Sequence, residues 1–152
     1  MIIIVDTNIA FSAILNIKST IGDLILNSDN IFEFRSCNYL IREIDNHWKK
    51  LQQISKLSHE ELIDIHRIVF KNIRFINEEL IPKKFWIKSY NLVNKIDMDD
   101  IAFIALNEFH DSLFWTGDKV LINGLRSLGY KKIISTDELI TLRNSLESKS
   151  SI

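Results

Sequence analysis

Short runs of consecutive hydrophobic residues alternate along this chain with longer segments in which hydrophobic residues recur every three or four positions. The runs are rich in β-branched and aromatic side chains, which is typical of strands buried on both faces of a sheet. They lie at residues 2–5, 31–34, 73–76, 112–116 and 132–135. Helical spacing is found at residues 9–15 and 21–26, from 38, from 58, after Pro82, from 97, and at 119–128 and 137–146. Strands that alternate with helices in this way predict an α/β fold with a mainly parallel sheet.

The helix that begins at residue 38 carries both a hydrophobic stripe and a carboxylate beside it. The stripe consists of Leu40, Ile44, His47 and Leu51. We interpret His47 as a histidine packed in the core, because it lies within this stripe. The alternative is contact with the wall of a site beside Glu43, which is one helical turn away. Glu43 lies on the flank of the stripe, about 60° from Leu40 on a helical wheel of 100° per residue. A carboxylate at the edge of a core needs a partner, because burying an unpaired charge is costly.

Composition limits the class of protein without revealing its activity. The 152 residues, 46% hydrophobic and 26% charged with a net charge of −1, predict one domain over residues 1–146 and a frayed tail at 147–152. Hydrophobic runs are far shorter than the ~18 residues of a membrane span, and residues 1–5 lack the features of a signal peptide. With a single cysteine, Cys37, these features favour the reducing cytoplasm. The net charge neither indicates nor excludes a nucleic-acid partner.

Acidic residues stand where the predicted strands end. Asp6 directly follows the first strand, Asp118 follows the fourth, and Asp100 begins the helix that leads to the fourth. In open parallel sheets, binding sites form beyond the carboxyl ends of the strands, where the strand order reverses. If the first and fourth strands are neighbours there, these carboxylates converge, and Glu43 joins them. Clustered carboxylates repel one another, and an oxygen-only cluster favours Mg²⁺ or Mn²⁺ as the neutralising ion.

Four motifs together resemble the PIN-domain nuclease family over about residues 1–140. They are Ile4-Val-Asp6-Thr-Asn8, the mid-chain helical Glu43, Asp97-Met-Asp-Asp100-Ile-Ala-Phe-Ile-Ala105 and Phe114-Trp-Thr-Gly-Asp118-Lys119. The resemblance implies a three-layer fold with a five-stranded, mainly parallel sheet of order 3-2-1-4-5. It also implies Mg²⁺- or Mn²⁺-dependent hydrolysis of RNA phosphodiester bonds by the toxin of a toxin–antitoxin pair. The expected partners are therefore RNA and an inhibitory antitoxin protein, and a homodimer is left open.

The resemblance also assigns roles to individual residues. By position, Asp6, Glu43, Asp100 and Asp118 correspond to the catalytic acids of the family, the three aspartates as metal ligands. Asn8 and Thr116 match its supporting polar residues, and Asp97 matches an additional acid of part of the family. The simpler interpretation is that Asp6, Asp118 and one of Asp97 and Asp100 cap helices.

A basic segment precedes the acids at residues 97–100. Lys83, Lys84 and Lys88 are interleaved there with Trp86 and Tyr90. The default interpretation is a solvated helix face. The alternative is an RNA-binding surface, in which lysines contact phosphates and an aromatic ring stacks on a base.

Two other functions remain open at this level. A haloacid dehalogenase-like phosphatase also has an aspartate at a strand end, but it needs a second acid two residues later, where this chain has Asn8. A PIN-like module that binds RNA or protein without cleavage is the non-enzymatic alternative. Cleavage of RNA in the presence of a divalent metal separates these possibilities from the nuclease.

Overall fold

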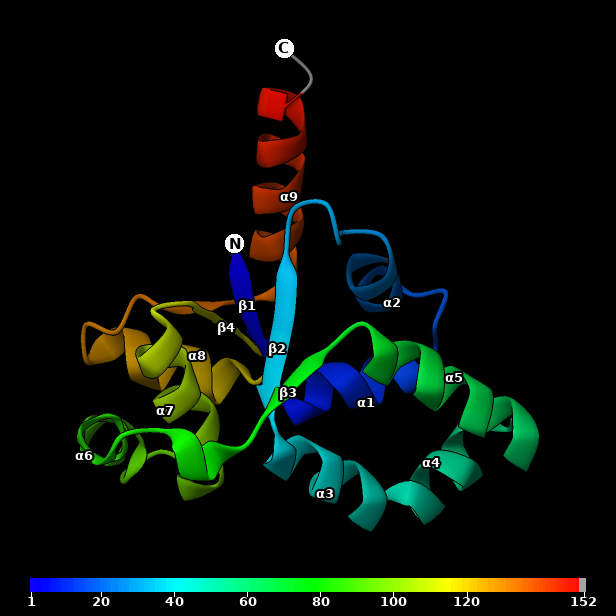
Figure 1. Ribbon diagram of the computed structural model, residues 1–152, viewed down its shortest axis with the longest axis horizontal. Coiled ribbons are helices and arrows are strands. Elements are labelled where there is room, and N and C mark those ends of the chain that lie inside the picture. The colour runs from blue at the N-terminus through cyan, green and yellow to red at the C-terminus, as the bar shows by residue number, and fades with distance from the viewer. Residues whose placement is uncertain (151–152) are drawn as a thin grey trace.

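Five parallel strands form one sheet in the computed structural model, which describes residues 1–150 (Figure 1). The strand order is β3-β2-β1-β4-β5, which confirms the predicted fold. The strands are β1 (Ile2–Val5), β2 (Glu33–Cys37), β3 (Arg74–Ile76), β4 (Leu113–Trp115) and β5 (Ile133–Ile134). Of the tail predicted to fray, residues 151–152 lie outside the described part of the chain.

The order reverses between β1 and β4, and this junction positions the candidate site. Val5 at the end of β1 pairs with Trp115 at the end of β4. The next amide continues this pairing, because the Asp6 N–H donates to the Trp115 carbonyl at 3.1 Å. Asp6 and the residues after Trp115 therefore leave the sheet side by side.

Helices cover both faces of the sheet (Figure 1). They are α1 (Thr7–Leu15), α2 (Thr20–Leu26), α3 (Asn38–Asn46), α4 (Trp48–Ser55), α5 (His59–Lys71), α6 (Lys83–Val93), α7 (Ile101–His110), α8 (Lys119–Ser127) and α9 (Thr136–Ser150), with 3₁₀ turns η1 (Glu78–Leu80) and η2 (Met98–Asp100). Helix α1 packs against α2, α4 and α5, while α7 packs against β1, β2, β4 and α6. Ser58 and Glu61 form a capping box at the start of α5.

The core lies between these layers and explains the unbroken hydrophobic runs. Ile3, Ile4 and Val5 of β1 are fully buried because β1 is central and has a helix layer on each face. Helix α7 is buried along most of its length, and its Phe103 stacks on Phe114 of β4 with ring centroids 5.7 Å apart.

The helix predicted from residue 38 is in fact two helices, and the interpretation of His47 as a core residue is wrong. Helix α3 ends at Asn46, and His47 is exposed in a non-helical conformation before α4 begins. The break lets Trp48 pack edge-on against His66 of α5, with ring centroids 5.2 Å apart. Leu51 is then buried from α4 rather than from a continuous stripe. The helical spacing of hydrophobic residues continues across the break, whereas the helix itself is interrupted there.

Other element boundaries shift by a few residues. Strand β2 runs from Glu33 to Cys37, and the segment predicted as a helix from residue 97 is a 3₁₀ turn followed by α7. Helix α9 continues to Ser150, four residues beyond the predicted end at Leu146.

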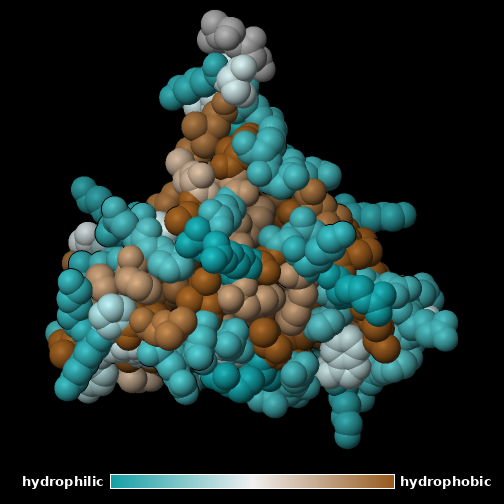
Figure 2. All heavy atoms as spheres, viewed as in Figure 1, coloured by the Kyte–Doolittle hydropathy of each residue, from teal (hydrophilic) through white to brown (hydrophobic). Residues whose placement is uncertain are grey.

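Helix α9 extends well beyond the N-terminal end of β1 (Figure 1). Arg143 attaches it to α2 through an ion pair of 3.0 Å with Asp23. Figure 2 shows hydrophobic side chains where α9 leaves the body and hydrophilic side chains over much of the rest of this face. Within residues 1–150, no single helix is long and apolar enough to cross a membrane; α1 and α2 reach that length and composition only together, as a pair bent by 105°.

Candidate active site

Asp6 is held rigidly at the junction of β1 and α1. The residue is only 5% exposed, and each of its carboxylate oxygens accepts hydrogen bonds. Oδ1 accepts from the backbone N–H of Thr7 at 2.7 Å, which caps α1. Oδ2 accepts from the Asn8 amide at 3.0 Å and from the Thr116 hydroxyl at 2.5 Å. Asp6 therefore fulfils the capping role and also points a fixed carboxylate into the junction.

Asn8 and Thr116 link the two strand ends through hydrogen bonds. The Thr116 hydroxyl is buried and accepts the backbone N–H of Asp118 at 3.1 Å. The Asn8 side-chain oxygen accepts the backbone N–H of Gly117 at 3.2 Å. This network fixes the loop after β4 relative to Asp6 across a separation of about a hundred residues in sequence.

Asp118 caps α8 with one oxygen only. Its Oδ1 accepts the backbone N–H groups of Val120 and Leu121 at 3.0 and 3.1 Å. Such a cap orients the side chain, because both bonds are made to the first turn of the helix. Capping and ion binding are therefore compatible at this residue.

Glu43 reaches the same place from α3. Its Oε1 accepts the hydroxyl of Thr7, the first residue of α1, at 2.5 Å. Burial raises the pKa of Glu43, and the nearby Asp99 and Asp97 carboxylates raise it further, while the Thr7 hydrogen bond and His47 lower it. The sequence predicted that the Glu43 carboxylate has a partner, and the structure shows that this partner is the Thr7 hydroxyl, with other acids close by.

A cavity of about 340 Å³ lies beyond the carboxyl ends of β1 and β4. Its acidic lining residues are Asp6, Glu43, Asp97, Asp99, Asp100 and Asp118, and its other lining residues are Thr7, Asn8, Phe11, Ser12, His47 and Lys50. Carboxylate oxygens of Asp97, Asp100 and Asp118 all lie within 4.8 Å of one another. The structure thus brings together all the acids expected at the site, with Asp97 closer to the centre than its supporting role implied.

Mutual repulsion and burial shift the titration of these acids. Burial raises the pKa of Asp100 to about 8, and Asp6, Asp97, Asp118 and Glu43 contribute to the increase. Burial raises the pKa of Asp6 to about 6, although its hydrogen bonds from Thr116 and Thr7 act in the opposite direction. Oxygen donors whose negative charges repel one another fit a hard divalent cation such as Mg²⁺ or Mn²⁺, which neutralises the charge that burial disfavours.

Sequence reasoning missed three residues that line the cavity, Lys50 of α4 and Phe11 and Ser12 of α1. His47 also lines the cavity, as the alternative to its core position allowed. A signal was present, because Glu43, His47 and Lys50 follow the i, i+4, i+7 spacing of one helix face. The hydrophobic stripe obscured it by including His47.

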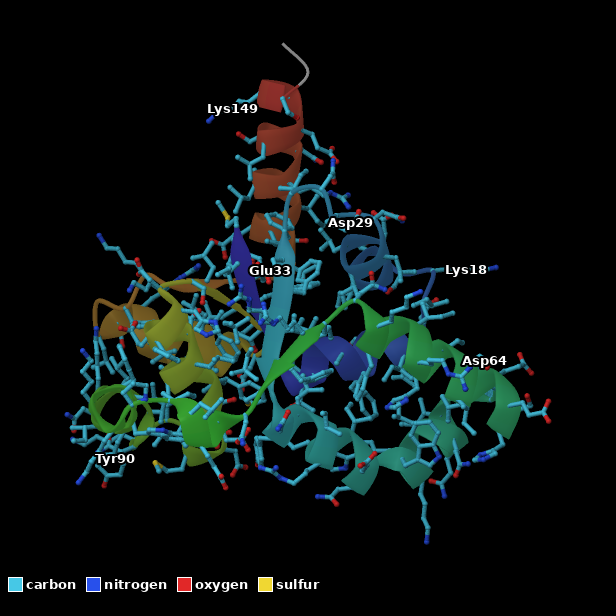
Figure 3. The ribbon with its side chains drawn as sticks, in the orientation of Figure 1. Lys18, Asp29, Glu33, Asp64, Tyr90 and Lys149 are labelled. Atoms are coloured by element: carbon cyan, nitrogen blue, oxygen red, sulfur yellow. The ribbon has the colours of Figure 1, made fainter. Side chains whose placement is uncertain are left out.

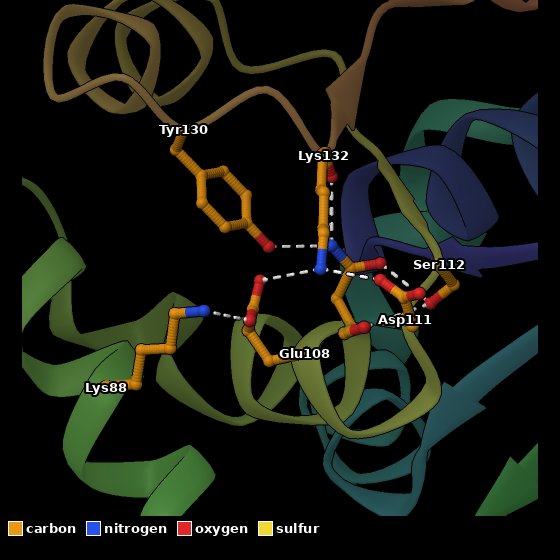
Figure 4. Close-up of polar contacts among 7 residues, drawn as sticks. Lys88, Glu108, Asp111, Ser112, Tyr130 and Lys132 are labelled. Atoms are coloured by element: carbon orange, nitrogen blue, oxygen red, sulfur yellow. Dashed lines mark hydrogen bonds and ion pairs between the residues drawn. The ribbon is translucent and has the colours of Figure 1, made fainter.

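The lysines predicted to bind RNA lie outside this cavity. Lys88 forms an ion pair of 2.6 Å with Glu108, whose side chain is 4% exposed, and Lys132 approaches the other oxygen of Glu108 at 3.7 Å (Figure 4). Lys83 and Lys84 are exposed on α6, and Tyr90 points away from the body of the molecule (Figure 3). Phosphate binding by Lys83 and Lys84 stays a prediction, while Lys88 has a structural partner.

Comparison with known proteins agrees with this geometry. The sequence matches the family described as PIN domain over residues 4–145. A similar solved structure is that of VapBC2 from Rickettsia felis bound to a DNA fragment from their promoter, with a TM-score of 0.67 and 12% sequence identity over 89% of this chain and 98% of that chain. At this identity the likeness shows the fold. No curated protein matches the chain in sequence.

Proposed function

Because the chain belongs to the PIN domain family, we propose that it is a nuclease that hydrolyses RNA phosphodiester bonds with the help of Mg²⁺ or Mn²⁺. The observation that carries this proposal is the convergence of carboxylates from four separate segments in one cavity. Buried structural acids are normally paired with cations. Asp97 and Asp118 each cap a helical segment, but they and Asp100 approach one another within 4.8 Å, and within residues 1–150 none of the three forms an ion pair with a cation. Such a cluster is typical of sites that bind metal and phosphate.

Asp100 and Asp118 would hold the metal at the centre of the cluster, with Asp6 and Asp97 beside them. When bound, the cation polarises a phosphate oxygen and lowers the pKa of a water molecule. Asp6 is prevented from turning by its hydrogen bonds from Asn8 and Thr116. The chain thereby presents the cluster in a fixed geometry before substrate arrives.

Glu43 is suited to orient the attacking water and to accept its proton. Thr7 occupies Oε1 of Glu43, which fixes the direction of the other oxygen. A carboxylate with a raised pKa is a better proton acceptor than an exposed one, and general-base catalysis favours a pKa close to the working pH. The reaction then needs no covalent intermediate on the protein.

We further propose that the chain is the toxin of a toxin–antitoxin pair in the cytoplasm. The family resemblance implies this role, and the fold similarity to VapBC2 supports it. A free ribonuclease would damage the RNA of its own cell, so an inhibitory protein partner is expected. That partner would cover the acidic cavity or prevent RNA from entering it.

Incubating the purified protein with mixed RNA in Mg²⁺, Mn²⁺ or EDTA tests this function. We expect cleavage with either metal and none with EDTA. Asp6→Asn and Asp118→Asn should each reduce cleavage more than about a hundredfold, since each removes a charge from the cluster. Asp64→Asn, an exposed residue of α5 outside the cavity (Figure 3), should cleave like wild type.

Two results would contradict the proposal. Undiminished cleavage by both Asp6→Asn and Asp118→Asn would show that the reaction occurs elsewhere. Binding of RNA without cleavage in either metal would favour the silent binding module instead.

A further inference from the structure

The acidic cavity also has a basic residue in its lining. Among the residues that the structure describes, Lys50 is the one lysine or arginine that lines this cavity. It comes from the first turn of α4, next to the exposed His47. Six carboxylates make the rest of the cavity repellent to RNA. A positively charged side chain in its lining therefore attracts an RNA phosphate at that point.

The Lys50 ammonium lies over an aromatic ring and is not neutralised. Its Nζ lies over the ring of Phe11, 5.8 Å from the centroid, a distance typical of cation–π contacts. Within residues 1–150, Lys50 forms no ion pair, although it shares the cavity with several acids. Lys88 differs in this respect, because its charge is directed to Glu108. Lys50 therefore retains the capacity to bind an anion at the cavity wall.

We propose that Lys50 binds a phosphate of the RNA backbone adjacent to the phosphate that is cleaved. This inference rests on the proposed function and identifies how the substrate chain leaves the cavity, along α4 rather than along α6. The scissile phosphate belongs at the acids, where a cation can bridge it to the carboxylates. The neighbouring phosphate has no such bridge and needs a positive side chain, which Lys50 supplies as a flexible point charge.

Lys49 offers a matched control for this proposal. It precedes Lys50 on α4, carries the same charge and is exposed, but it does not line the cavity. Replacing either lysine by alanine changes the net charge equally. Lys50→Arg preserves the charge and should retain most of the binding. Since both side chains are at the surface, none of these variants should lose the fold, which melting curves would verify.

The first measurement is RNA binding without catalysis. Glu43→Gln is introduced into wild type and into each lysine variant to prevent cleavage while the metal is present. The affinity of a fluorescent ten-nucleotide RNA is then measured by anisotropy at fixed Mg²⁺ and several KCl concentrations. We expect Lys50→Ala to weaken binding on the order of tenfold, as the loss of one charge-assisted contact does. The slope of log affinity against log salt should become shallower by about 0.7. Lys49→Ala should match wild type, and equal affinities and slopes for the two alanine variants would overturn the proposal.

The second measurement varies substrate length with Mg²⁺ or Mn²⁺ present. A dinucleotide contains one phosphodiester and a trinucleotide contains two, so only the trinucleotide can reach both the acids and Lys50. Lys50→Ala should raise KM for the trinucleotide by about tenfold, with a smaller change in kcat, and should leave the dinucleotide unaffected. An equal loss of kcat on both substrates would overturn the proposal, because Lys50 would then act on the reacting phosphate. If wild type cleaves neither substrate, the proposed function fails, and the binding measurement still decides the role of Lys50.

Discussion

At the scale of single residues, the burial of Asp100 makes the stability of the protein depend on pH. The residue is 8% exposed, and its pKa in the folded protein is about 8, against 3.8 for the free side chain. Between these pH values the folded state holds a proton that the unfolded chain releases. The contribution of Asp100 to stability is therefore largest below about pH 4 and declines as pH rises toward 8. Asp6, with a pKa of about 6, contributes a smaller change of the same sign.

Replacing Asp100 by asparagine should remove most of this dependence. In EDTA, wild type should lose melting temperature between pH 5 and pH 8, and Asp100→Asn should lose less. At pH 8 the variant should melt about 4–8 °C higher, which corresponds to about 2 kcal/mol. Melting curves at four pH values measure this, with Asp64→Asn as the control that keeps the wild-type slope. Parallel curves for wild type and Asp100→Asn would show that Asp100 is not held in a repulsive cluster.

The position of an individual residue could be predicted from the sequence where the fold fixes that position directly. Asp6 and Asp118 follow adjacent strands, so their places at the sheet edge follow from the strands alone. Lys50 and the central position of Asp97 depend on the path of a loop and on the break at His47, which hydrophobic spacing does not reveal. A sequence pattern indicates on which face of its own helix or strand a residue lies. It does not show which faces of different elements come together to line a cavity.

At the scale of elements, helix α6 owes its position to a buried carboxylate as well as to hydrophobic packing. Glu108 of α7 lies between Lys88 of α6 and Lys132 of the segment before β5 (Figure 4). The Lys132 ammonium also contacts Asp111 at 2.6 Å. Sequence reasoning assigned the lysines of α6 to solvent or RNA because charge patterns do not show which cation meets a carboxylate on another element.

Lys88→Ala should therefore destabilise the protein, whereas Lys84→Ala should not. Lys88→Ala removes the closer partner of the buried Glu108 carboxylate. We expect the free energy of unfolding to fall by about 1–2 kcal/mol, a value that allows for the exposure of Lys88. That corresponds to about 2–8 °C in melting temperature. Urea unfolding of both variants measures the difference. Equal stabilities would mean that Lys132 alone satisfies Glu108.

At the scale of the whole molecule, the fold was predictable but its strand order was not predictable from periodicity alone. Alternating strands and helices indicated a parallel sheet, and the order 3-2-1-4-5 came from the family resemblance. The structure confirms that order and shows why the site depends on it. Only a sheet in which β1 and β4 are neighbours brings Asp6 beside Thr116 and the loop that carries Asp118.

The central claim is that these converging carboxylates form a shared site for a divalent metal. A melting curve with and without Mn²⁺ at fixed ionic strength tests this claim most directly. At about a hundredfold excess over its dissociation constant, Mn²⁺ should stabilise wild type by about 2.7 kcal/mol and raise its melting temperature by about 5–10 °C. Asparagine can still cap α8, so metal-free Asp118→Asn should melt no lower than wild type but should lose most of the increase. Asp64→Asn should keep the full increase. If wild type shows no shift with Mn²⁺, or if Asp118→Asn shows the same shift, the carboxylates do not form a shared metal site.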